Sequence, residues 1–237
     1  MQQGVLLRRV IAAATPIALS YIPIGLACGV LGSKCGIGPG AAAVLSATII
    51  SGGAQFMISN MWLAGLPAAT IVASVCAVSL RFALYSASLA PYLQRARKRT
   101  ILAMALTLIE EGYGVTLAKL ADGDRNWTFR HAFALNVITI ATWVASVAAG
   151  AALGAVIDIP TAIASFAMTA LFIYLLWDQL QGGSIGNAVA AAVGAAAVIC
   201  KLVGWTAVAV PLAAVAGVIA ALAAAHANDS KKGGEAQ

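Results

Sequence analysis

Four polar side chains that could bind ions or exchange protons lie inside long apolar segments of the chain. They are Gln55, Arg81, Glu110 and Glu111. An arginine at the centre of a bilayer costs about 3 kcal/mol on insertion scales. A buried amide is also costly unless it is hydrogen-bonded. These four residues are therefore expected to face protein, water or a bound ion, and we interpret them as the centre of a polar site inside a membrane.

The background of these residues is strongly apolar. The chain has 237 residues, of which 62% are apolar and 9% charged, and its mean hydropathy is +0.94. Soluble domains carry about 25% charged residues, whereas apolar runs long enough to cross a bilayer recur along this chain. The composition predicts an all-α polytopic integral membrane protein. We expect one membrane domain over residues 1–227 and a polar, mobile tail over 228–237.

Turns and charged loops divide the chain into apolar segments that predict about seven transmembrane helices, within a range of roughly six to eight. The last two are too short or too uniform to decide between two crossings and one crossing plus a half-helix. In chain order the segments are Val10–Leu31, Pro39–Leu66, Pro67–Leu93, Ile101–Leu120, His131–Val156, Thr161–Leu180, Asn187–Lys201 and Gly204–Ala225.

The second segment contains two adjacent glycines, Gly52 and Gly53, followed by Gln55 and Phe56. A glycine lowers helix stability by about 1 kcal/mol relative to alanine. Inside a membrane a helix can break only where protein or water covers the break. We expect a break at Gly52-Gly53, with Gln55 facing a transport path. The alternative is a close contact between helices, which small residues also permit.

The charge distribution indicates how this segment enters the membrane. Basic residues face the cytoplasm more often than not, and they cluster at Arg8-Arg9 and at Arg95–Arg99. If both clusters are cytoplasmic, an even number of crossings separates them. Because Val10–Leu31 and Pro67–Leu93 supply two crossings, Pro39–Leu66 is then a re-entrant hairpin. A single span with the second basic cluster outside is the competing arrangement.

The first span contains Pro16 and Pro23, and each proline removes one intrahelical hydrogen bond. We expect this helix to be bent or opened near its middle. In the third span Arg81 lies about 18–21 Å from either end, which is close to the bilayer midplane. Tyr85 follows one turn later and extends the polar face of Arg81.

Glu110 and Glu111 lie midway along the fourth segment. Adjacent residues point about 100° apart on a helix, so the two carboxylates are expected to serve different partners. We expect one of them to pair with Arg81 and the other to carry a proton. The alternative is that both only neutralise buried cations.

Several classes of function are excluded or disfavoured. The sequence has no phosphate-binding P-loop, dinucleotide fingerprint, GxSxG or HExxH motif. Its two histidines lie at segment edges, and its four cysteines have no metal-ligand spacing. We therefore expect no enzyme, no cofactor and no metal. The basic clusters indicate membrane orientation and contact with lipid headgroups rather than nucleic acid.

Polar groups at the midplane beside a broken helix are typical of secondary transporters. The residues alone indicate a secondary transporter or a channel for a small polar solute. A membrane subunit that anchors a partner without transporting anything is a further alternative. None of these patterns identifies a substrate.

Four motifs in chain order resemble a known family, the large subunit of the branched-chain amino-acid exporters (the AzlC type, LIV-E family). The resemblance covers most of the first 120 residues. It departs from the usual pattern at Ser79 and Phe82, where the family commonly has Asn and His, and at Glu110, where Asp is usual. The motifs are Ala14–Ile17 with Tyr21–Leu26 and Gly29, Ser51–Phe56, Leu80-Arg81 with Tyr85–Leu89 and Pro91, and Glu110–Tyr113.

This resemblance implies export of leucine, isoleucine and valine, with methionine as a further candidate, from a prokaryotic cytoplasm across the inner membrane. It also implies proton-motive drive and a small membrane partner of the AzlD type. A zwitterionic substrate needs a cation for its carboxylate, and Arg81 is the candidate. Its amino group would bind Glu111 or the carbonyls freed at Gly52-Gly53, and its side chain would contact Phe56. Pro23, Gly25, Gln55 and Tyr85 complete the expected substrate site, and Glu110 or Glu111 exchanges the proton.

Overall fold

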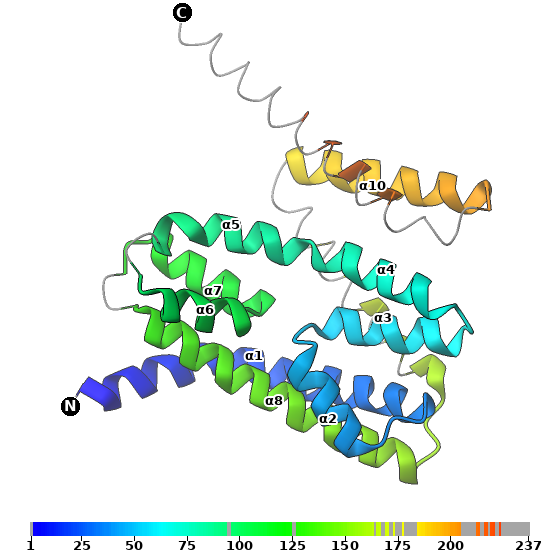
Figure 1. The fold of residues 1–237 in the computed structure, drawn as a ribbon, viewed down its shortest axis with the longest axis horizontal. Coiled ribbons are helices and arrows are strands. Elements are labelled where there is room, and N and C mark those ends of the chain that lie inside the picture. Colours follow the sequence, from blue (N-terminus) through cyan, green and yellow to red (C-terminus); the bar gives the residue numbers. More distant parts are fainter. Residues whose placement is uncertain are drawn as a thin grey trace, which may run out of the picture. The chain divides into compact units, whose positions relative to one another are not determined.

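The computed structural model describes residues 2–93, 96–124, 127–163 and 184–204 without interruption, and isolated positions between 165 and 223 (Figure 1). The described elements are helices, as expected. The chain forms two compact units, residues 1–66 with 79–168, and residues 67–78 with 169–237. The helices are α1 (Gln2–Lys34), α2 (Pro39–Thr48), α3 (Gly52–Leu63), α4 (Ala68–Ser79), α5 (Arg81–Leu93), α6 (Lys98–Leu106), α7 (Glu110–Ala121), α8 (Phe129–Val156) and α10 (Ser184–Leu202).

Among the described residues, three stretches are long and apolar enough to cross a membrane: Leu7–Lys34, Ala68–Leu93 and Phe129–Val156. This confirms the predicted class, a helical membrane protein, while the expected total of about seven crossings stays a prediction. Most of Thr161–Leu180 and of Gly204–Ala225, and the whole tail over 228–237, lie outside the described residues.

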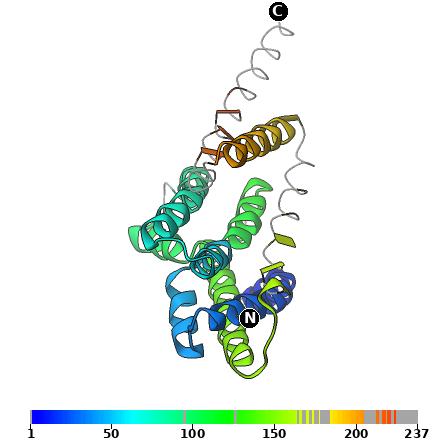
Figure 2. The same ribbon diagram turned by 90° about the vertical axis from the view of Figure 1, so that its right-hand side faces the viewer.

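The first unit is built on α1 and α8, which lie side by side in Figures 1 and 2. Their contacts keep the same order along both helices, so the two helices are parallel. Arg9 pairs with Asp124 just before α8 at 3.7 Å, and Lys34 pairs with Asp158 just after it. Asp158 is outside the spanning helices, and the Lys34 ammonium holds the pKa of its carboxyl below the usual range.

Glycines set the close approach of these two helices. A Cβ atom added at Gly29 would lie 2.0 Å from the carbonyl oxygen of Val147, and one added at Gly150 would lie 2.2 Å from that of Leu26. A Cβ at Gly25 would lie 2.7 Å from the Cβ of Ser146. Small residues let helix backbones approach in this way inside membranes, where dispersion contacts replace the hydrophobic effect.

The helix α1 remains continuous through Pro16 and Pro23. An opening of this helix is therefore not found, while the alternative, a bend near its middle, stays a prediction. Each proline still lacks an N–H group, so the carbonyl four residues earlier loses its usual intrahelical partner. The long contact with α8 holds the helix together through this region.

The second apolar segment forms a helical hairpin, α2 and α3, and not a continuous span. Along α3, Gln55 lies beside Cys28 of α1, and the carbonyl of Ser59 lies 3.5 Å from the sulfur of Cys35, which follows α1. α3 therefore runs parallel to α1 and ends at the level from which α2 started. This is the same-side return that the basic clusters predicted.

The break itself lies at Ile49–Ser51, and the predicted position at Gly52-Gly53 was wrong by a few residues. Ser51 has extended backbone angles (φ −149°, ψ 109°) and its hydroxyl accepts a hydrogen bond from the backbone N–H of Ala54. A serine in this geometry caps the start of a helix. The two glycines consequently form the first turn of α3, where Gly52 leaves room for the ring of Trp143.

A second hairpin, α6 and α7, replaces the single helix that we expected over Ile101–Leu120. The chain leaves helical geometry at Thr107–Ile109. α7 runs beside α5 in the same direction, because Arg81 pairs with Glu110 and Ser88 contacts Tyr113. α7 is antiparallel to α1, because Glu111 contacts Tyr21 near the middle of α1 and Asp124 contacts Arg9 near its start.

The helical pattern of Pro67–Leu93 is also interrupted, at Leu80. We expected one continuous helix here, and the structure instead starts α5 at Arg81, whose first turn is closed by a hydrogen bond from Ala83 N–H to the Leu80 carbonyl. Arg81 is still the fourteenth residue of the 26-residue stretch Ala68–Leu93, close to its centre. The predicted midplane depth of Arg81 agrees with this position.

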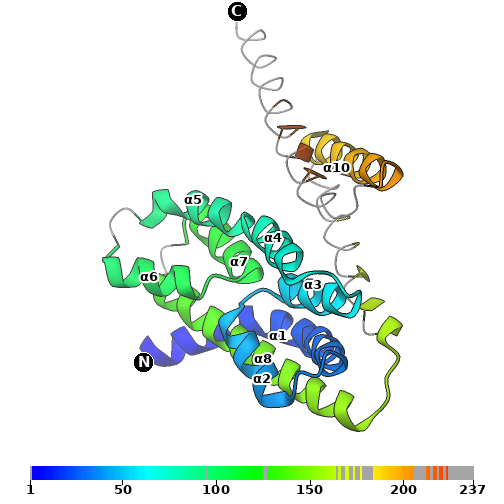
Figure 3. The ribbon, with the colours of Figure 1, turned by 45° about the vertical axis from the view of Figure 1, so that its right-hand side comes forward.

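The first unit thus contains the same arrangement twice, in opposite directions. α1 precedes the hairpin α2–α3, and α5 precedes the hairpin α6–α7. Figure 3 shows α2–α3 towards the C-terminal ends of α1 and α8, and α6–α7 towards their N-terminal ends. In the second unit, α10 starts three residues before the predicted Asn187. There Gly217 packs against Val193.

Candidate functional site

Three interruptions of helical geometry meet around one guanidinium group. Ser51 caps α3, Arg81 begins α5 and Glu110 begins α7. The Nη2 atom of Arg81 donates a hydrogen bond to the Ser51 hydroxyl at 3.2 Å and forms an ion pair with the carboxylate of Glu110. The predicted pairing of one glutamate with Arg81 is therefore confirmed, and Glu110 is that glutamate.

Arg81 has donor capacity beyond these two contacts. Both contacts use Nη2, and the buried Nε atom has no hydrogen-bond partner among the described groups. The side chain is 22% exposed. Arginine carries five N–H donors in a planar fork that matches a carboxylate with two parallel hydrogen bonds. The N–H groups outside Nη2 can donate single hydrogen bonds to a second carboxylate, or to another anion, without loss of Glu110.

Glu111 points away from this pair and accepts a hydrogen bond from the hydroxyl of Tyr21 on α1. The residue is exposed within this single chain. The predicted divergence of the two adjacent carboxylates is thus observed. Tyr21 in turn packs edge-on against Trp143 with 5.3 Å between ring centroids, and Trp143 packs on Gly52. The tip of the first hairpin, the middle of α1 and the start of α7 are joined through these contacts.

Helix ends add to the electrostatics of this cluster. The N-terminus of a helix carries about +0.5 elementary charge from unpaired N–H groups. α3 and α7 both start here, after Ser51 and at Glu110, so their positive ends face the same region as Arg81. Two glutamates in the first turn of α7 offset part of that charge. The cluster therefore combines fixed positive groups with carboxylates able to exchange a cation or a proton.

Aromatic side chains of α5 and α7 lie next to Arg81. Tyr85 stacks on Tyr113 with ring centroids 4.3 Å apart and an interplanar angle of 18°. The hydroxyls of Ser88 and Tyr113 are 2.8 Å apart. Phe82 lies beside the guanidinium, with the Arg81 Cζ atom 5.5 Å from its ring centroid. Tyr85 therefore does share the face of Arg81, as predicted, and contributes ring surface to it.

Gln55 and Phe56 occupy other surroundings than the ones we expected. The Gln55 carbonyl oxygen accepts a hydrogen bond from Ser46 at 2.8 Å, and its amide nitrogen donates to the Ile49 carbonyl at 2.6 Å. These bonds tie α3 to the end of α2. Phe56 is fully buried in an apolar cluster that includes Leu31 and Trp143. Their roles in substrate binding stay predictions, and the contacts observed here hold the hairpin in place.

The remaining predicted residues lie on the two helices that frame the break. Gly25 packs against Ser146 of α8, and Gly53 is buried in the first turn of α3. Pro23 is exposed on α1, two residues beyond Tyr21. Sequence reasoning had not selected Tyr21, Ser51 or Trp143. The first two lie inside the motifs that carry the family resemblance, whereas nothing in the sequence around Trp143 indicated that it faces the glycines.

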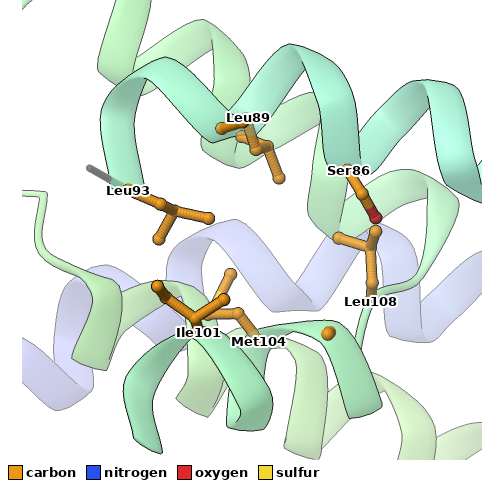
Figure 4. A pocket seen from close by; sticks show the side chains of 8 residues that line it. Ser86, Leu89, Leu93, Ile101, Met104 and Leu108 are labelled. Atoms are coloured by element: carbon orange, nitrogen blue, oxygen red, sulfur yellow. The ribbon is translucent and has the colours of Figure 1, made fainter. Parts of the chain in front are cut away.

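An apolar pocket of about 250 Å³ lies between α5 and α6 (Figure 4). Leu89, Leu93, Ile101, Met104 and Leu108 line most of it. Such a lining offers hydrocarbon contact but no group for a charged ligand. Among the described residues no cluster of histidine, cysteine or acidic side chains could hold a metal ion. The polar cluster around Arg81 is therefore the candidate site.

Residues 16–157 match the family model described as AzlC protein, and this range covers more than half of the chain. The chain belongs to the AzlC family. This AzlC chain is 29% identical over 209 residues to the inner membrane protein YgaZ of Escherichia coli (strain K12), covering 86% of this chain and 83% of YgaZ. It is 27% identical over 221 residues to an uncharacterized membrane protein of Archaeoglobus fulgidus, covering 92% and 94%.

The matched range of the AzlC family contains every residue of the cluster, from Tyr21 to Trp143. Both relatives are named as membrane proteins, in agreement with the apolar helices of this AzlC protein. The family resemblance stated from the motifs is confirmed. No solved structure matches the chain.

Proposed function

We propose that this AzlC protein is a secondary transporter that exports branched-chain and related neutral aliphatic amino acids in exchange for protons. We place it in the inner membrane of a prokaryote, as the large subunit of a pair whose small subunit is of the AzlD type. The substrate class and the partner rest on the family resemblance. The transport proposal rests mainly on the position of Arg81. Its guanidinium lies where three helix interruptions meet, and only its Nη2 atom is bound by the described groups.

Arg81 supplies the cation that the carboxylate of an amino acid requires. Its Nη2 atom is held by Ser51 and Glu110, so the fork is fixed in direction before a substrate arrives. Nε has no partner among the described groups, so it and Nη1 are left to donate charge-assisted hydrogen bonds to the substrate carboxylate. Because the donors are already oriented, little conformational entropy is lost on binding. The positive ends of α3 and α7 favour the same carboxylate.

Glu111 supplies the acceptor for the ammonium group of the substrate. A proton and an ammonium group cannot both neutralise one carboxylate at the same time. If a proton arriving from outside displaces the ammonium from Glu111, uptake of that proton is linked to release of the amino acid. This competition gives exchange in opposite directions, which is what export driven by an inward proton gradient requires. Tyr21 orients the Glu111 carboxylate through its hydroxyl.

The opposed hairpins supply an architecture for alternating access. Repeated units of inverted direction, with broken helices at the substrate site, are a common design of secondary transporters. In this AzlC protein, α2–α3 and α6–α7 approach Arg81 from opposite ends of α1 and α8. Movement of one hairpin opens the site to one side of the membrane, and movement of the other opens it to the opposite side.

Counterflow of radiolabelled leucine in proteoliposomes tests this function. We expect entry of label into vesicles loaded with unlabelled leucine, with and without the small subunit compared in parallel. Arg81→Ala is expected to raise the half-saturating leucine concentration by about ten- to a hundredfold, as loss of charge-assisted hydrogen bonds predicts. Arg99→Ala, an exposed arginine in the first turn of α6, is the matched control and should transport normally.

Two other outcomes would point to other classes of protein. Flux that never accumulates leucine against a gradient and ignores the pH gradient indicates a channel. A protein that assembles with its partner and shows no flux under any condition indicates a membrane scaffold. Full transport by a correctly folded Arg81→Ala variant would contradict the assignment of the site.

A further inference from the structure

Two buried polar side chains between α7 and α8 have no hydrogen-bond partner among the described groups. Asn136 of α8 is completely buried, and neither its amide nitrogen nor its amide oxygen is paired. Thr116 of α7 is 1% exposed and its hydroxyl is unpaired. Both lie outside the cluster around Arg81 that the proposed function uses.

Thr116 differs from other threonines of these helices. Thr107, Thr139 and Thr142 each donate a hydrogen bond to the carbonyl four residues earlier. A threonine inside a helix can reach that carbonyl by choice of rotamer. The hydroxyl of Thr116 is aimed elsewhere, which indicates a partner other than its own helix.

Gly112 places the two unpaired side chains on one contact surface. A Cβ atom added at Gly112 would lie 1.9 Å from the amide oxygen of Asn136, so the missing side chain is what accommodates this amide. Thr116 is one helical turn beyond Gly112, on the same face of α7. Asn136 and Thr116 therefore both project into the contact between α7 and α8.

The hydrogen-bonding groups of Asn136 and Thr116 indicate what kind of ligand they would bind. An amide and a hydroxyl together offer both donors and acceptors, and no charged side chain is among them. A cation would use only the acceptors and an anion only the donors. Water uses both, and folded proteins hold about one buried water per 27 residues, each with about three hydrogen bonds to groups of this kind.

Asn136 and Thr116 lie near Glu111, at the contact between α7 and α8. Glu111 directly precedes Gly112 at the start of α7. Beyond Thr116 the helix ends at Ala121, and Asp124 contacts Arg9 at the start of α1. The pair thus lies between the midplane carboxylate and the end of the unit that carries the basic clusters. Trp127 and His131 occupy that end, and the Trp127 indole nitrogen is also buried and unpaired.

We propose that Asn136 and Thr116 bind ordered water that conducts protons between Glu111 and the end of the unit marked by Arg9 and His131. Chains of polar side chains and water are the usual means by which protons cross apolar protein. This inference rests on the proposed proton coupling. It assigns to the α7–α8 contact the proton path on the cytoplasmic side, and it leaves amino-acid recognition to Arg81.

The test measures leucine counterflow and proton movement in the same proteoliposomes, with a pH-sensitive dye inside. Leucine-for-leucine exchange needs no proton step, whereas net export does. We expect Thr116→Val and Asn136→Leu to exchange leucine at the wild-type rate, while net export and the proton movement linked to it slow by about a hundredfold, as loss of a proton-transfer group predicts. Thr116→Ser should restore the rate of net export. Thr142→Val, whose hydroxyl bonds only its own helix, is the matched control.

Net export at the wild-type rate in both folded variants overturns the water path and leaves the transport proposal intact. If the wild-type protein moves no leucine, the proposed function fails, and the water site is then judged by a high-resolution experimental map. Density within hydrogen-bond distance of both Asn136 and Thr116 supports the site. Direct bonding of these groups to other protein atoms overturns it. Thermal unfolding in detergent identifies any variant that is misfolded.

Discussion

Arg81 and Glu110 each begin a helix, and their side chains pair across the gap between α5 and α7. The pair joins the second hairpin to the span that precedes it. Ser51 brings the first hairpin to the same guanidinium. One arginine therefore lies at all three breaks described above, and any movement of either hairpin changes what this arginine binds.

A double-mutant cycle measures the coupling between these two residues. Removing one partner of a largely buried pair leaves an uncompensated charge, so Arg81→Ala alone should destabilise more than Arg81→Ala combined with Glu110→Gln. We expect an interaction free energy of about 1–3 kcal/mol. Reversible unfolding in detergent or bicelles provides the four values. An interaction free energy near zero would contradict the pairing.

Substitution of Glu111 tests the assignment of the coupling carboxylate. Glutamine keeps the shape of the side chain and the bond to Tyr21 but cannot bind or release a proton. We expect Glu111→Gln to require more leucine for half-saturation, and its remaining flux to be independent of the pH gradient. Leucine uptake at several imposed pH gradients gives this response.

Tyr21→Phe is the companion variant, because it removes only the hydroxyl that orients Glu111. It should weaken the pH response without abolishing it. Retention of the full pH response by Glu111→Gln would move the coupling role to Glu110 or to another group.

Gln55 is expected to matter for stability. Its amide joins Ser46 and the Ile49 carbonyl across the hairpin break. Gln55→Leu leaves the buried Ser46 hydroxyl and the part-buried Ile49 carbonyl without this partner, and an unpaired buried group costs about 1–3 kcal/mol. We expect a clear fall in the thermal unfolding temperature.

Thr48→Val is the matched control for this variant, because the exposed hydroxyl of Thr48 bonds only to carbonyls of its own helix. Its unfolding temperature should be unchanged. If Gln55→Leu is as stable as the wild type yet loses transport, Gln55 faces the substrate and the original sequence interpretation is correct.

Two glycines in α1 provide a matched test of the contact with α8. A Cβ at Gly29 would lie 2.0 Å from a backbone oxygen of α8, whereas no atom lies within 4 Å of one added at Gly32. Gly29→Ala therefore forces the helices apart and should lower the unfolding temperature strongly. Gly32→Ala should be neutral or stabilising, since alanine favours a helix by about 1 kcal/mol over glycine. Equal effects of the two changes would contradict the parallel close contact.

The first hairpin could be predicted because its signals are local and unusual. Two glycines in hydrocarbon and the distribution of basic residues both indicated a break and a same-side return. The exact position could not be predicted, because a glycine pair is compatible with the first turn of a helix as well as with a break. The capping role of Ser51 depends on its extended backbone, which only the structure reveals.

The second hairpin gave a weaker signal that we interpreted differently. Leu106–Ile109 contains neither glycine nor proline, so nothing marked the end of α6. Glu110 and Glu111 are, however, acidic residues in the first turn of a helix, the position that the helix dipole favours. We interpreted the two glutamates only as ion-binding or proton-exchanging groups and did not use them to predict the start of a helix.

Polar residues in apolar segments proved to have two separate uses. Arg81 was correctly predicted to pair with one of the two adjacent glutamates, because a midplane charge needs a partner, and the structure shows that Glu110 is this glutamate. Gln55 was expected to face the same path, but it bonds the Ser46 hydroxyl and the Ile49 carbonyl of its own hairpin instead. Sequence alone does not separate a binding site from a structural hydrogen bond. In both cases a buried polar group has the partner that it requires.

The most direct test of the central claim is leucine transport against its concentration gradient by the purified protein and its small partner in proteoliposomes. Protons and labelled leucine are followed together under an imposed pH gradient. The account predicts that leucine moves uphill and that protons move in the opposite direction. It also predicts that Arg81→Ala sharply reduces both movements near the wild-type half-saturating leucine concentration, while Arg99→Ala reduces neither. Leucine that only equilibrates, with no proton movement linked to it, would contradict the account.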